Sequence, residues 1–326
     1  MTGVERCDRS RERRAVRSRR CSGGVLAPGN SSRTGAGTIP VVPESAFAVD
    51  APVHVVAAAL RHTRTVTGFL GATAERAPEA VGELLLAGDR FPVAVGAGDA
   101  AEPEDAGGEG GGVGTVLRAD EAGLRLRLDS PAVGGPVLLE FRPEERTTGN
   151  RSRCEVHLAG ESLPRWLCGR VSACLAAVRE LVSEWAPRPV VVGTALVEDG
   201  MLLAQQRCYP AHHAGSWELP GGRVEPGEDE PEAVVRECRE ELATEVVPLG
   251  RVGTDIPLSA GSGMLLRVWR ARLAAGARPP VPVEHRALRW IELSQLAGLE
   301  WLEADRLLLD SLRTIMVAES GKHDPK

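Results

Sequence analysis

Hydrophobic positions recur along the chain with two different periods, and the change of period separates strands from helices. Leu124, Leu126 and Leu128 alternate with Arg125 and Arg127, which is the period of a half-buried strand. Further along, apolar residues fall at spacings of three and four, which predicts one long helix with a sustained apolar face. That face is formed by Leu167, Val171, Cys174, Val178, Leu181 and Trp185.

Shorter segments before residue 186 complete an α+β pattern. Strands are predicted at 46–49, 137–141 and 154–158, a helix begins at Pro52, and 84–86 and 91–95 suggest a hairpin. Residues 98–114 form an acidic, glycine-rich loop. Residues 1–42 are rich in Arg, Ser and Gly with little to bury, which predicts a disordered tail.

The element order over residues 43–186 resembles the helix-grip fold of START-like, polyketide-cyclase-like proteins. A strand, helices, several antiparallel strands and one long helix follow one another, although no sequence motif accompanies them. The resemblance implies a cavity for an apolar small ligand under the long helix. The alternative is a filled core that serves as a structural or homodimer-forming partner, and the sequence leaves both open.

The second half begins after the stiff linker Trp185-Ala-Pro-Arg-Pro189. Residues 190–197 and 201–206 are apolar strands around a turn at Asp199-Gly200. Pro220-Gly-Gly222 then forms a tight bend in which the backbone can approach a ligand closely. Helix formers run from 231 to 243, preceded by acidic residues that suit a helix N-terminus.

Composition narrows the class of protein. A length of 326 residues favours two domains, and 43% hydrophobic residues are ordinary for a globular chain. The net charge of −6 argues against a protein that coats nucleic acid, and the chain lacks the roughly 20-residue apolar run of a membrane span. Seven cysteines without a C-x-x-C pair argue against disulfides and structural zinc, and favour the cytoplasm.

Three glutamates on the predicted helix are the main candidates for chemistry. Glu237, Glu240 and Glu241 stand at positions i, i+3 and i+4, so they share a face and repel one another. The repulsion disappears if divalent cations bind there, and Mg²⁺ prefers carboxylate and phosphate oxygens. Arg236 precedes the cluster and could orient one carboxylate through paired hydrogen bonds.

With the bend before it, this helix resembles the box of the Nudix hydrolases, G-x5-E-x7-R-E-U-x-E-E-x-G-U, where U is apolar. Ala243 and Thr244 depart from the last two positions. The resemblance implies an α/β/α sandwich with a mixed sheet over residues 187–319, followed by a short tail at 320–326. The matching residues are Gly222, Glu228, Arg236, Glu237, Glu240 and Glu241.

The resemblance also implies roles for these residues. The carbonyl of Gly221 and the side chains of Glu237, Glu240 and Glu241 are expected to hold Mg²⁺, for which Mn²⁺ could substitute. Arg236 is expected to orient Glu237, and Glu228 to be structural. Glu284 in a later loop is either a further carboxylate of the site or a plain surface charge. Whether Glu237, Glu241 or Glu284 acts as the general base stays open.

The run Trp217-Glu-Leu-Pro-Gly-Gly222 is similar to that of MutT-type enzymes, which implies hydrolysis of a (deoxy)nucleoside triphosphate to a monophosphate and pyrophosphate. Arg207 and Gly222 are then expected at the substrate phosphates. Asp305 is expected either to accept from the base, which favours cytidine or oxidised purine nucleotides, or to be a plain helix charge. The alternatives are an ADP-ribose pyrophosphatase and a non-catalytic sensor, and the complete set of box glutamates argues against the sensor.

Overall fold

The computed structural model describes residues 45–70, 84–93, 112–129, 135–148, 151–160, 165–258 and 263–321. The predicted tail at 1–42 and most of the predicted loop at 98–114 lie outside this range, as do residues 322–326. Residues 39–326 form one compact unit that contains two sheets. The boundary predicted near residue 186 stays a prediction.

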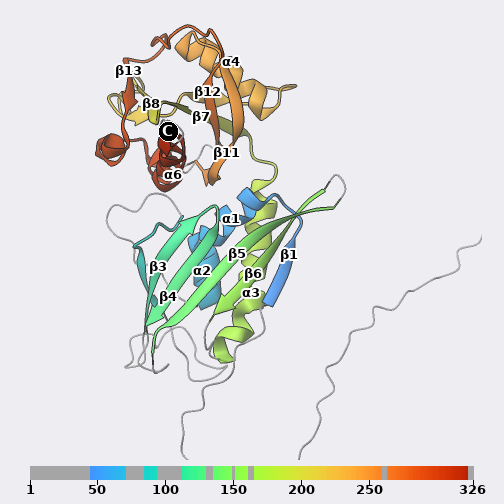
Figure 1. The fold of residues 1–326 in the computed structure, drawn as a ribbon. Helices are drawn as coiled ribbons and strands as arrows, with labels where there is room; N and C mark the ends of the chain where they lie inside the picture. The colour runs from blue at the N-terminus through green and yellow to red at the C-terminus, as the bar shows by residue number, and fades with distance from the viewer. Residues whose placement is uncertain are drawn as a thin grey trace, which may run out of the picture. The chain divides into compact units, whose positions relative to one another are not determined.

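The first sheet is antiparallel throughout and follows the order β1-β6-β5-β4-β3-β2 (Figure 1). The predicted alternation appears in β4, where Leu124, Leu126 and Leu128 are buried and Arg125 and Arg127 are exposed. The strands are β1 (Ser45–Val49), β2 (Arg90–Val93), β3 (Gly112–Asp120), β4 (Gly123–Asp129), β5 (Val137–Thr148) and β6 (Arg151–Gly160).

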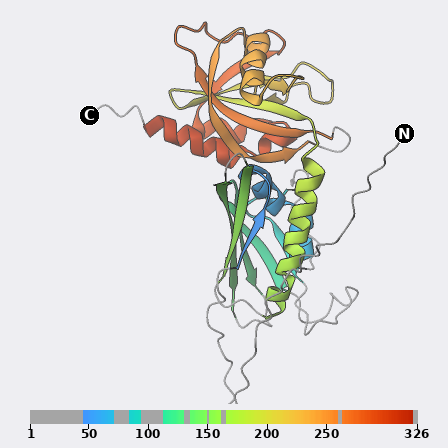
Figure 2. The ribbon, with the colours of Figure 1, turned by 90° about the vertical axis from the view of Figure 1, so that its right-hand side faces the viewer.

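Three helices cover one face of this sheet: α1 (Val53–Arg61), α2 (Thr63–Leu70) and α3 (Arg165–Trp185) (Figure 2). The predicted long helix is confirmed as α3. Four residues of its predicted apolar face, Cys174, Val178, Leu181 and Trp185, are at most 1% exposed. The element order is therefore the one expected from the sequence, a strand, helices, antiparallel strands and one long helix.

The hairpin predicted for 84–86 and 91–95 is wrong. Leu84 forms an isolated bridge with His62, whereas β2 pairs with β3. The carboxylate of Asp89 accepts a hydrogen bond from the backbone N–H of Leu86 at 2.9 Å and so closes a turn before β2. The two apolar segments therefore pair with other parts of the chain and not with each other. The alternation of residues within a segment does not show which segment it will pair with.

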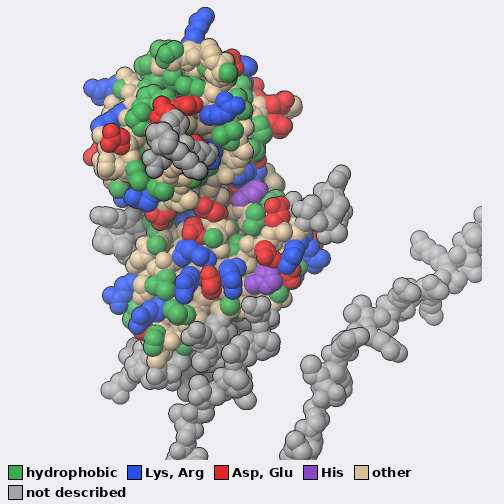
Figure 3. All heavy atoms as spheres, in the orientation of Figure 1, with side chains coloured by type: hydrophobic (Ala, Val, Ile, Leu, Met, Phe, Trp, Pro, Cys, Tyr) green, Lys and Arg blue, Asp and Glu red, His purple; other side chains and the backbone are tan. Residues whose placement is uncertain are grey.

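The outer face of the first sheet carries charges of both signs, which Figure 3 shows interspersed. Arg118 contacts Glu140 at 3.0 Å, and Arg127 contacts Asp129 at 2.9 Å. Exposed pairs of this kind contribute little to stability, but they make the face a mixed, solvated one rather than a basic surface.

The second sheet is mixed and runs in the order β11-β12-β7-β8-β13, with β9 added to β8 and β10 added to β7. β12 is parallel to β7, and the other pairings are antiparallel. The strands are β7 (Val190–Glu198), β8 (Met201–Gln206), β9 (Trp217–Glu218), β10 (Gly221–Arg223), β11 (Val246–Pro257), β12 (Leu265–Leu273) and β13 (Ala287–Ile291).

Helices cover both faces of this second sheet, which confirms the predicted α/β/α sandwich. The inner strand β7 is buried on both sides: Val192 and Leu196 pack with α4 (Glu230–Leu242), and Ala195 and Val197 lie in the core beneath α6 (Leu309–Ser320). Figure 2 shows α4 and α6 on opposite sides of the sheet. A 3₁₀ helix η3 (Leu293–Gly298) and the short α5 (Glu303–Arg306) lead into α6.

Two expectations from composition can be compared with the described residues. None of the helices described is long and apolar enough to cross a bilayer. The cysteines described, Cys154, Cys174, Cys208 and Cys238, are free thiols, of which only Cys208 is exposed.

Candidate active site

The helix that carries the predicted acids is fixed at both ends. Asp229 caps its N-terminus by accepting from the backbone N–H of Glu232 at 2.9 Å, and the Glu232 side chain accepts from the Asp229 N–H at 2.8 Å. This capping box satisfies two N–H groups that the helix itself leaves free. The C-terminal turn ends at Ala243 in the left-handed conformation, with φ of 50°.

The two glycines before the helix permit two close approaches. A Cβ on Gly221, whose φ is 152°, would come within 2.0 Å of the carbonyl oxygen of Val192 in β7. A Cβ on Gly222 would come within 2.1 Å of the carboxylate of Glu237. The bend therefore needs both residues to lack a side chain, and Glu237 lies directly against it.

The three predicted acids do not share one environment. Glu237 and Glu241 are 9% and 8% exposed, whereas the side chain of Glu240 is 54% exposed. Oε2 of Glu241 accepts hydrogen bonds from Gln205 Nε2 and from the backbone N–H of Gly221, both at 2.9 Å. Two acids thus face the bend, and the third lies at the edge of the site.

Arg236 holds the acids of the helix to the loop before it. Its guanidinium donates to Glu237 at 2.8 Å, to Glu240 at 3.1 Å and to the two oxygens of Glu228 at 2.7 and 3.1 Å. It also donates to the carbonyl of Arg223 at 2.8 Å. One planar donor group therefore orients Glu237 and fastens the loop that contains Glu228.

Burial raises the pKa of both inward acids. The pKa of Glu241 is raised to about 7, because desolvation outweighs the hydrogen bonds from Gln205 and Gly221. The pKa of Glu237 is raised by burial, and the nearby Glu240 and Glu228 act in the same direction, against the hydrogen bond from Arg236. A cation bound between Glu237 and Glu241 would offset the cost of burying their two negative charges.

A cation fits the donor chemistry of the two inward acids, although the described residues do not form a complete cage. No group of three His, Cys, Asp or Glu side chains among them is gathered closely enough to hold an ion. Carboxylate oxygens are nonetheless the ligands that hard cations prefer, and Mg²⁺ is commonly bound through one or two carboxylates plus other oxygens. Glu237 and Glu241 can supply these two.

Other predicted residues lie around Glu218 on β9. Arg207 Nη1 donates to its two oxygens at 2.9 and 2.6 Å. Asp305 is 5% exposed and accepts from the backbone N–H of Leu219 at 3.2 Å. Burial, and then the charge of Glu218, raise the pKa of Asp305 to about 7. Asp305 is thus a buried carboxyl in the first turn of α5.

Glu284 lies in the loop before β13 and is exposed. Its carbonyl accepts from the thiol of Cys208 at 3.3 Å. The neighbouring His285 is half-buried, and its ring nitrogens reach both Glu218 and Glu241. The structure thus places the loop of Glu284 beside Glu241 of α4, and the ring of His285 in this loop faces that acid.

Sequence reasoning missed Gln205, Glu218 and His285. Strand pairing aligns Gln205 with Glu218 across β8 and β9, and with Leu288 of β13 just beyond His285. The available signals were a polar residue ending an apolar strand and the glutamate within the Trp-Glu-Leu-Pro run. Neither signal shows that Gln205 will donate to Glu241 or that Glu218 will accept from Arg207.

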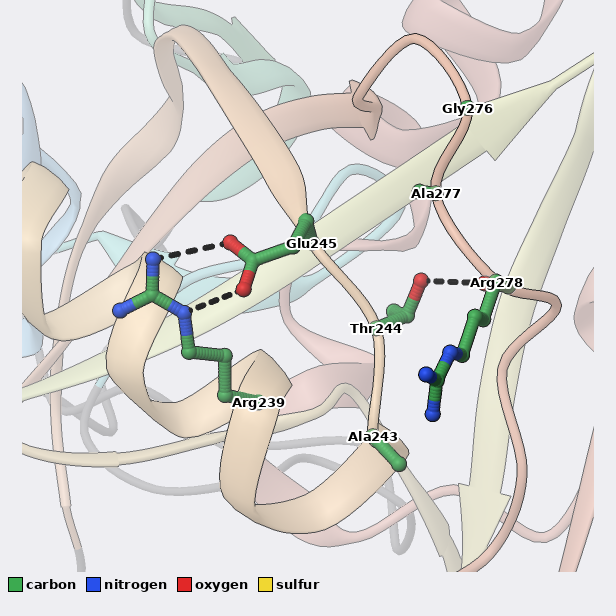
Figure 4. Close-up of a pocket in the computed structure, with 7 residues that line it drawn as sticks. All are labelled: Arg239, Ala243, Thr244, Glu245, Gly276, Ala277 and Arg278. Carbon is green, nitrogen blue, oxygen red and sulfur yellow. Dashed lines mark hydrogen bonds and ion pairs between the residues drawn. The ribbon is translucent and has the colours of Figure 1, made fainter.

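A separate hollow of about 380 Å³ lies at the C-terminal end of α4 (Figure 4). It contains none of the predicted site residues, but Ala243 and Thr244 line it, the two departures from the box pattern. The hydroxyl of Thr244 donates to the carbonyl of Arg278 at 2.5 Å, and Arg239 is paired with Glu245. Thr244 therefore ties the end of the helix to the loop after β12.

The NUDIX domain family model matches residues 187–311, which cover the second sheet and the acid-bearing helix. Over 138 residues the chain is 40% identical to the putative 8-oxo-dGTP diphosphatase 2 of Mycobacterium tuberculosis, and the match covers 41% of this chain and 95% of that relative. The chain belongs to the Nudix family. As a Nudix protein it carries a further sheet, β1 to β6, ahead of the residues that the family model matches.

Part of this chain is also similar to further relatives and solved structures. The CTP pyrophosphohydrolase of Escherichia coli is 32% identical over 128 residues, which are 39% of this chain and 93% of that protein. The crystal structure of a MutT NUDIX hydrolase from Burkholderia pseudomallei is 32% identical, with a TM-score of 0.32, and covers 38% of this chain and 97% of its own. The solution structure of the E. coli ORF135 protein is 28% identical with a TM-score of 0.35, covering 42% and 95%.

Proposed function

We propose that this Nudix protein hydrolyses a (deoxy)nucleoside triphosphate to the nucleoside monophosphate and pyrophosphate, with cytidine or oxidised purine nucleotides preferred. The observation that carries the proposal is the pair of buried carboxylates, Glu237 and Glu241, against the double-glycine bend. The names of two relatives, an 8-oxo-dGTP diphosphatase and a CTP pyrophosphohydrolase, support the same reaction class.

Mg²⁺ is the cation that we propose for the site, with Mn²⁺ as a substitute. Glu237 and Glu241 would hold it from the helix, Glu240 and the carbonyl of Gly221 are the further donors that the family pattern suggests, and phosphate oxygens would complete the shell. When bound, such an ion neutralises charge on the phosphates and aligns them for attack by water.

The chain's own residues would supply orientation and proton transfer. Arg236 keeps Glu237 turned to the bend, and the absent side chain of Gly222 leaves the space that the Glu237 carboxylate occupies. Arg207 is held at the end of β8, where its guanidinium can meet phosphate. Glu237, Glu241 and Glu284 stay open as the group that takes a proton from water, because each belongs to an element that borders the site.

Asp305 is our candidate for recognition of the base. Its raised pKa keeps it partly protonated near neutral pH, so one oxygen can accept and the other can donate. A protonated carboxyl can match a base edge that presents both an acceptor and a donor, as cytosine does. A nucleoside diphosphate derivative such as ADP-ribose stays the competing substrate.

The role of the first sheet stays a proposal. The space bordered by Leu60, Val66, Phe141, Cys174 and neighbouring side chains admits no water-sized sphere. This observation favours a filled core, with a structural or homodimer-forming role, over a cavity for an apolar ligand. We expect residues 187–326 expressed alone to retain hydrolase activity, since the family model matches residues 187–311 and a match of 128–138 residues covers 93–95% of each of two relatives.

The proposal can be tested with a panel of dCTP, CTP, 8-oxo-dGTP and ADP-ribose in the presence of Mg²⁺. Release of pyrophosphate and the monophosphate, fastest for a cytidine or oxidised purine nucleotide, is the expected result. Faster turnover of ADP-ribose than of every triphosphate would replace our substrate class. No turnover of any of them would favour a binding protein.

A variant separates catalysis from folding in the same assay. Glu241→Gln keeps an oxygen that can accept from Gln205 and Gly221, so we expect an unchanged fold and a rate reduced by roughly two orders of magnitude or more. The matched control is Glu245→Gln, whose exposed side chain lies outside the site. An unchanged rate for Glu241→Gln would remove this helix from the active site.

A further inference from the structure

His285 lies between the carboxylates of two different elements. Its Nε2 is 2.8 Å from Oε1 of Glu218 in β9, and its Nδ1 is 3.8 Å from Oε1 of Glu241 in α4. Only 9% of its side chain is exposed, and Nδ1 is buried without a hydrogen-bond partner among the described residues. A buried imidazole that meets a carboxylate on one side is a built feature, because burying polar groups costs free energy unless they are paired.

The backbone holds this histidine in place from two sides. The N–H groups of Val281 and Val283 donate to the carbonyls of Leu242 and Glu241 at 2.9 and 3.0 Å, which satisfies carbonyls that the last turn of α4 leaves free. The N–H of Arg286 donates to Gln206 at 2.8 Å and starts the pairing of β13 with β8. The helix and the sheet together fix where the ring lies.

Glu218 connects His285 to Arg207. The side chain of Glu218 is 12% exposed and receives donors from both residues. Arg207 also donates from Nε to the carbonyl of Tyr209 at 3.0 Å, while its Nη2 has no partner among the residues described. The direction of that remaining donor group therefore depends on how the carboxylate of Glu218 is turned.

We propose that His285 is a positioning residue that acts through Glu218 on Arg207. A carboxylate can only accept, so Nε2 carries the proton and donates to Glu218. This hydrogen bond keeps the carboxylate in the plane in which Arg207 binds it, and the free Nη2 is held towards substrate phosphate. The inference rests on the proposed function, because it takes Arg207 to be a phosphate-binding residue.

Three substitutions of the full chain separate the two ring nitrogens. Gln places its amide nitrogen near the position of Nε2, Asn places its own near Nδ1, and Ala removes both. We expect His285→Ala and His285→Asn to raise KM for the best nucleotide about tenfold, as expected for loss of a hydrogen bond to a charged group, with a smaller change in kcat. His285→Gln should stay within about threefold of the wild-type KM.

A double-mutant cycle tests the route through the arginine. If His285 acts through Arg207, adding His285→Ala to Arg207→Ala should leave KM unchanged within about twofold, whereas independent residues would multiply their effects. His157→Ala on β6 is the control for loss of an imidazole outside the site. Thermal unfolding of each protein shows whether it is folded, and the Gln and Asn variants remain informative if the Ala variant does not fold.

Three results would overturn the inference: a wild-type KM in folded His285→Ala, rescue by Asn and not by Gln, or multiplicative effects in the cycle. Failure of the proposed function appears in a different arm, because the wild type would then hydrolyse none of the nucleotides. That outcome would also overturn this inference, whereas an active wild type with an unaffected His285→Ala variant would overturn the inference alone.

Discussion

The carboxylate of Glu237 occupies the place where a side chain on Gly222 would begin, since a Cβ there would lie 2.1 Å from its Oε1. Gly222 in the bend and Glu237 in the helix, which are 15 positions apart in sequence, are thus in direct contact. Glycine is required at this point by the approach of a functional side chain, because the backbone of Gly222 has no left-handed φ.

Gly222→Ala should therefore displace Glu237 without unfolding the protein. The conflict involves the end of a flexible side chain, so we expect a loss of stability below about 1 kcal/mol. Displacement of about an ångström in a catalytic group can reduce kcat about 100-fold. Steady-state kinetics and thermal unfolding measure the two effects. Gly250→Ala, where an added Cβ meets nothing within 4 Å, is the control, and equal rates for both variants would contradict the prediction.

Ala243→Gly should stabilise the protein. Ala243 ends α4 with φ of 50°, a conformation that costs an L-residue with a Cβ about 1 kcal/mol relative to glycine. We expect the free energy of unfolding to rise by about that amount in denaturant titration. The same substitution at Ala233 within α4 should have the opposite sign, because glycine weakens a helix interior. Destabilisation by both substitutions would show that the C-terminal turn tolerates alanine without strain.

Asp305→Asn should stabilise the protein at high pH. Burial raises the pKa of Asp305 to about 7, well above the value of about 3.9 in an unfolded chain. The folded state then holds the proton more tightly, so wild-type stability falls as pH rises from about 4 to about 7 and stays low above. At pH 8 we expect the variant to be more stable by about 2–4 kcal/mol, with little difference at pH 4.

Unfolding midpoints of the wild type and of Asp305→Asn at pH 4, 6 and 8 provide the measurement. Asp310→Asn, at an exposed position of the last helix, is the control and should show no such pH-dependent gain. If the difference between wild type and Asp305→Asn were the same at all three pH values, the buried carboxyl would titrate as in the unfolded chain.

A buried ion network anchors the N-terminus of the acid-bearing helix. Asp255 is fully buried and contacts Arg251 at 2.7 Å and Arg267 at 2.9 Å, and both arginines also contact Glu230 in the first turn of α4. Asp255→Asn leaves the half-buried guanidinium groups of Arg251 and Arg267 without half of their counter-charge. We expect a loss of about 3 kcal/mol in denaturant titration, against less than about 0.5 kcal/mol for the exposed Asp129→Asn. Equal losses would show that the network is solvated.

The chain order of the fold was accessible from sequence because its signals are local. The apolar spacing of α3, the alternation of β4 and the capping residues before α4 each involve neighbours within a few positions. The paired hairpin expected at 84–95 failed for the complementary reason. An apolar segment indicates that it will be buried, but the register of its partner depends on the rest of the sheet.

By itself, then, the sequence determined the acid-bearing helix, the double-glycine bend and the Nudix family, since these depend on a fixed spacing within one short stretch. Only the tertiary structure decided that Glu240 lies at the edge while Glu237 and Glu241 face inward. It also brought Gln205 of β8 and His285 of the loop before β13 to Glu241 of α4, and the same His285 to Glu218 of β9. The physical reason is that burial and hydrogen bonding between distant segments arise from packing, which spacing along the chain does not encode.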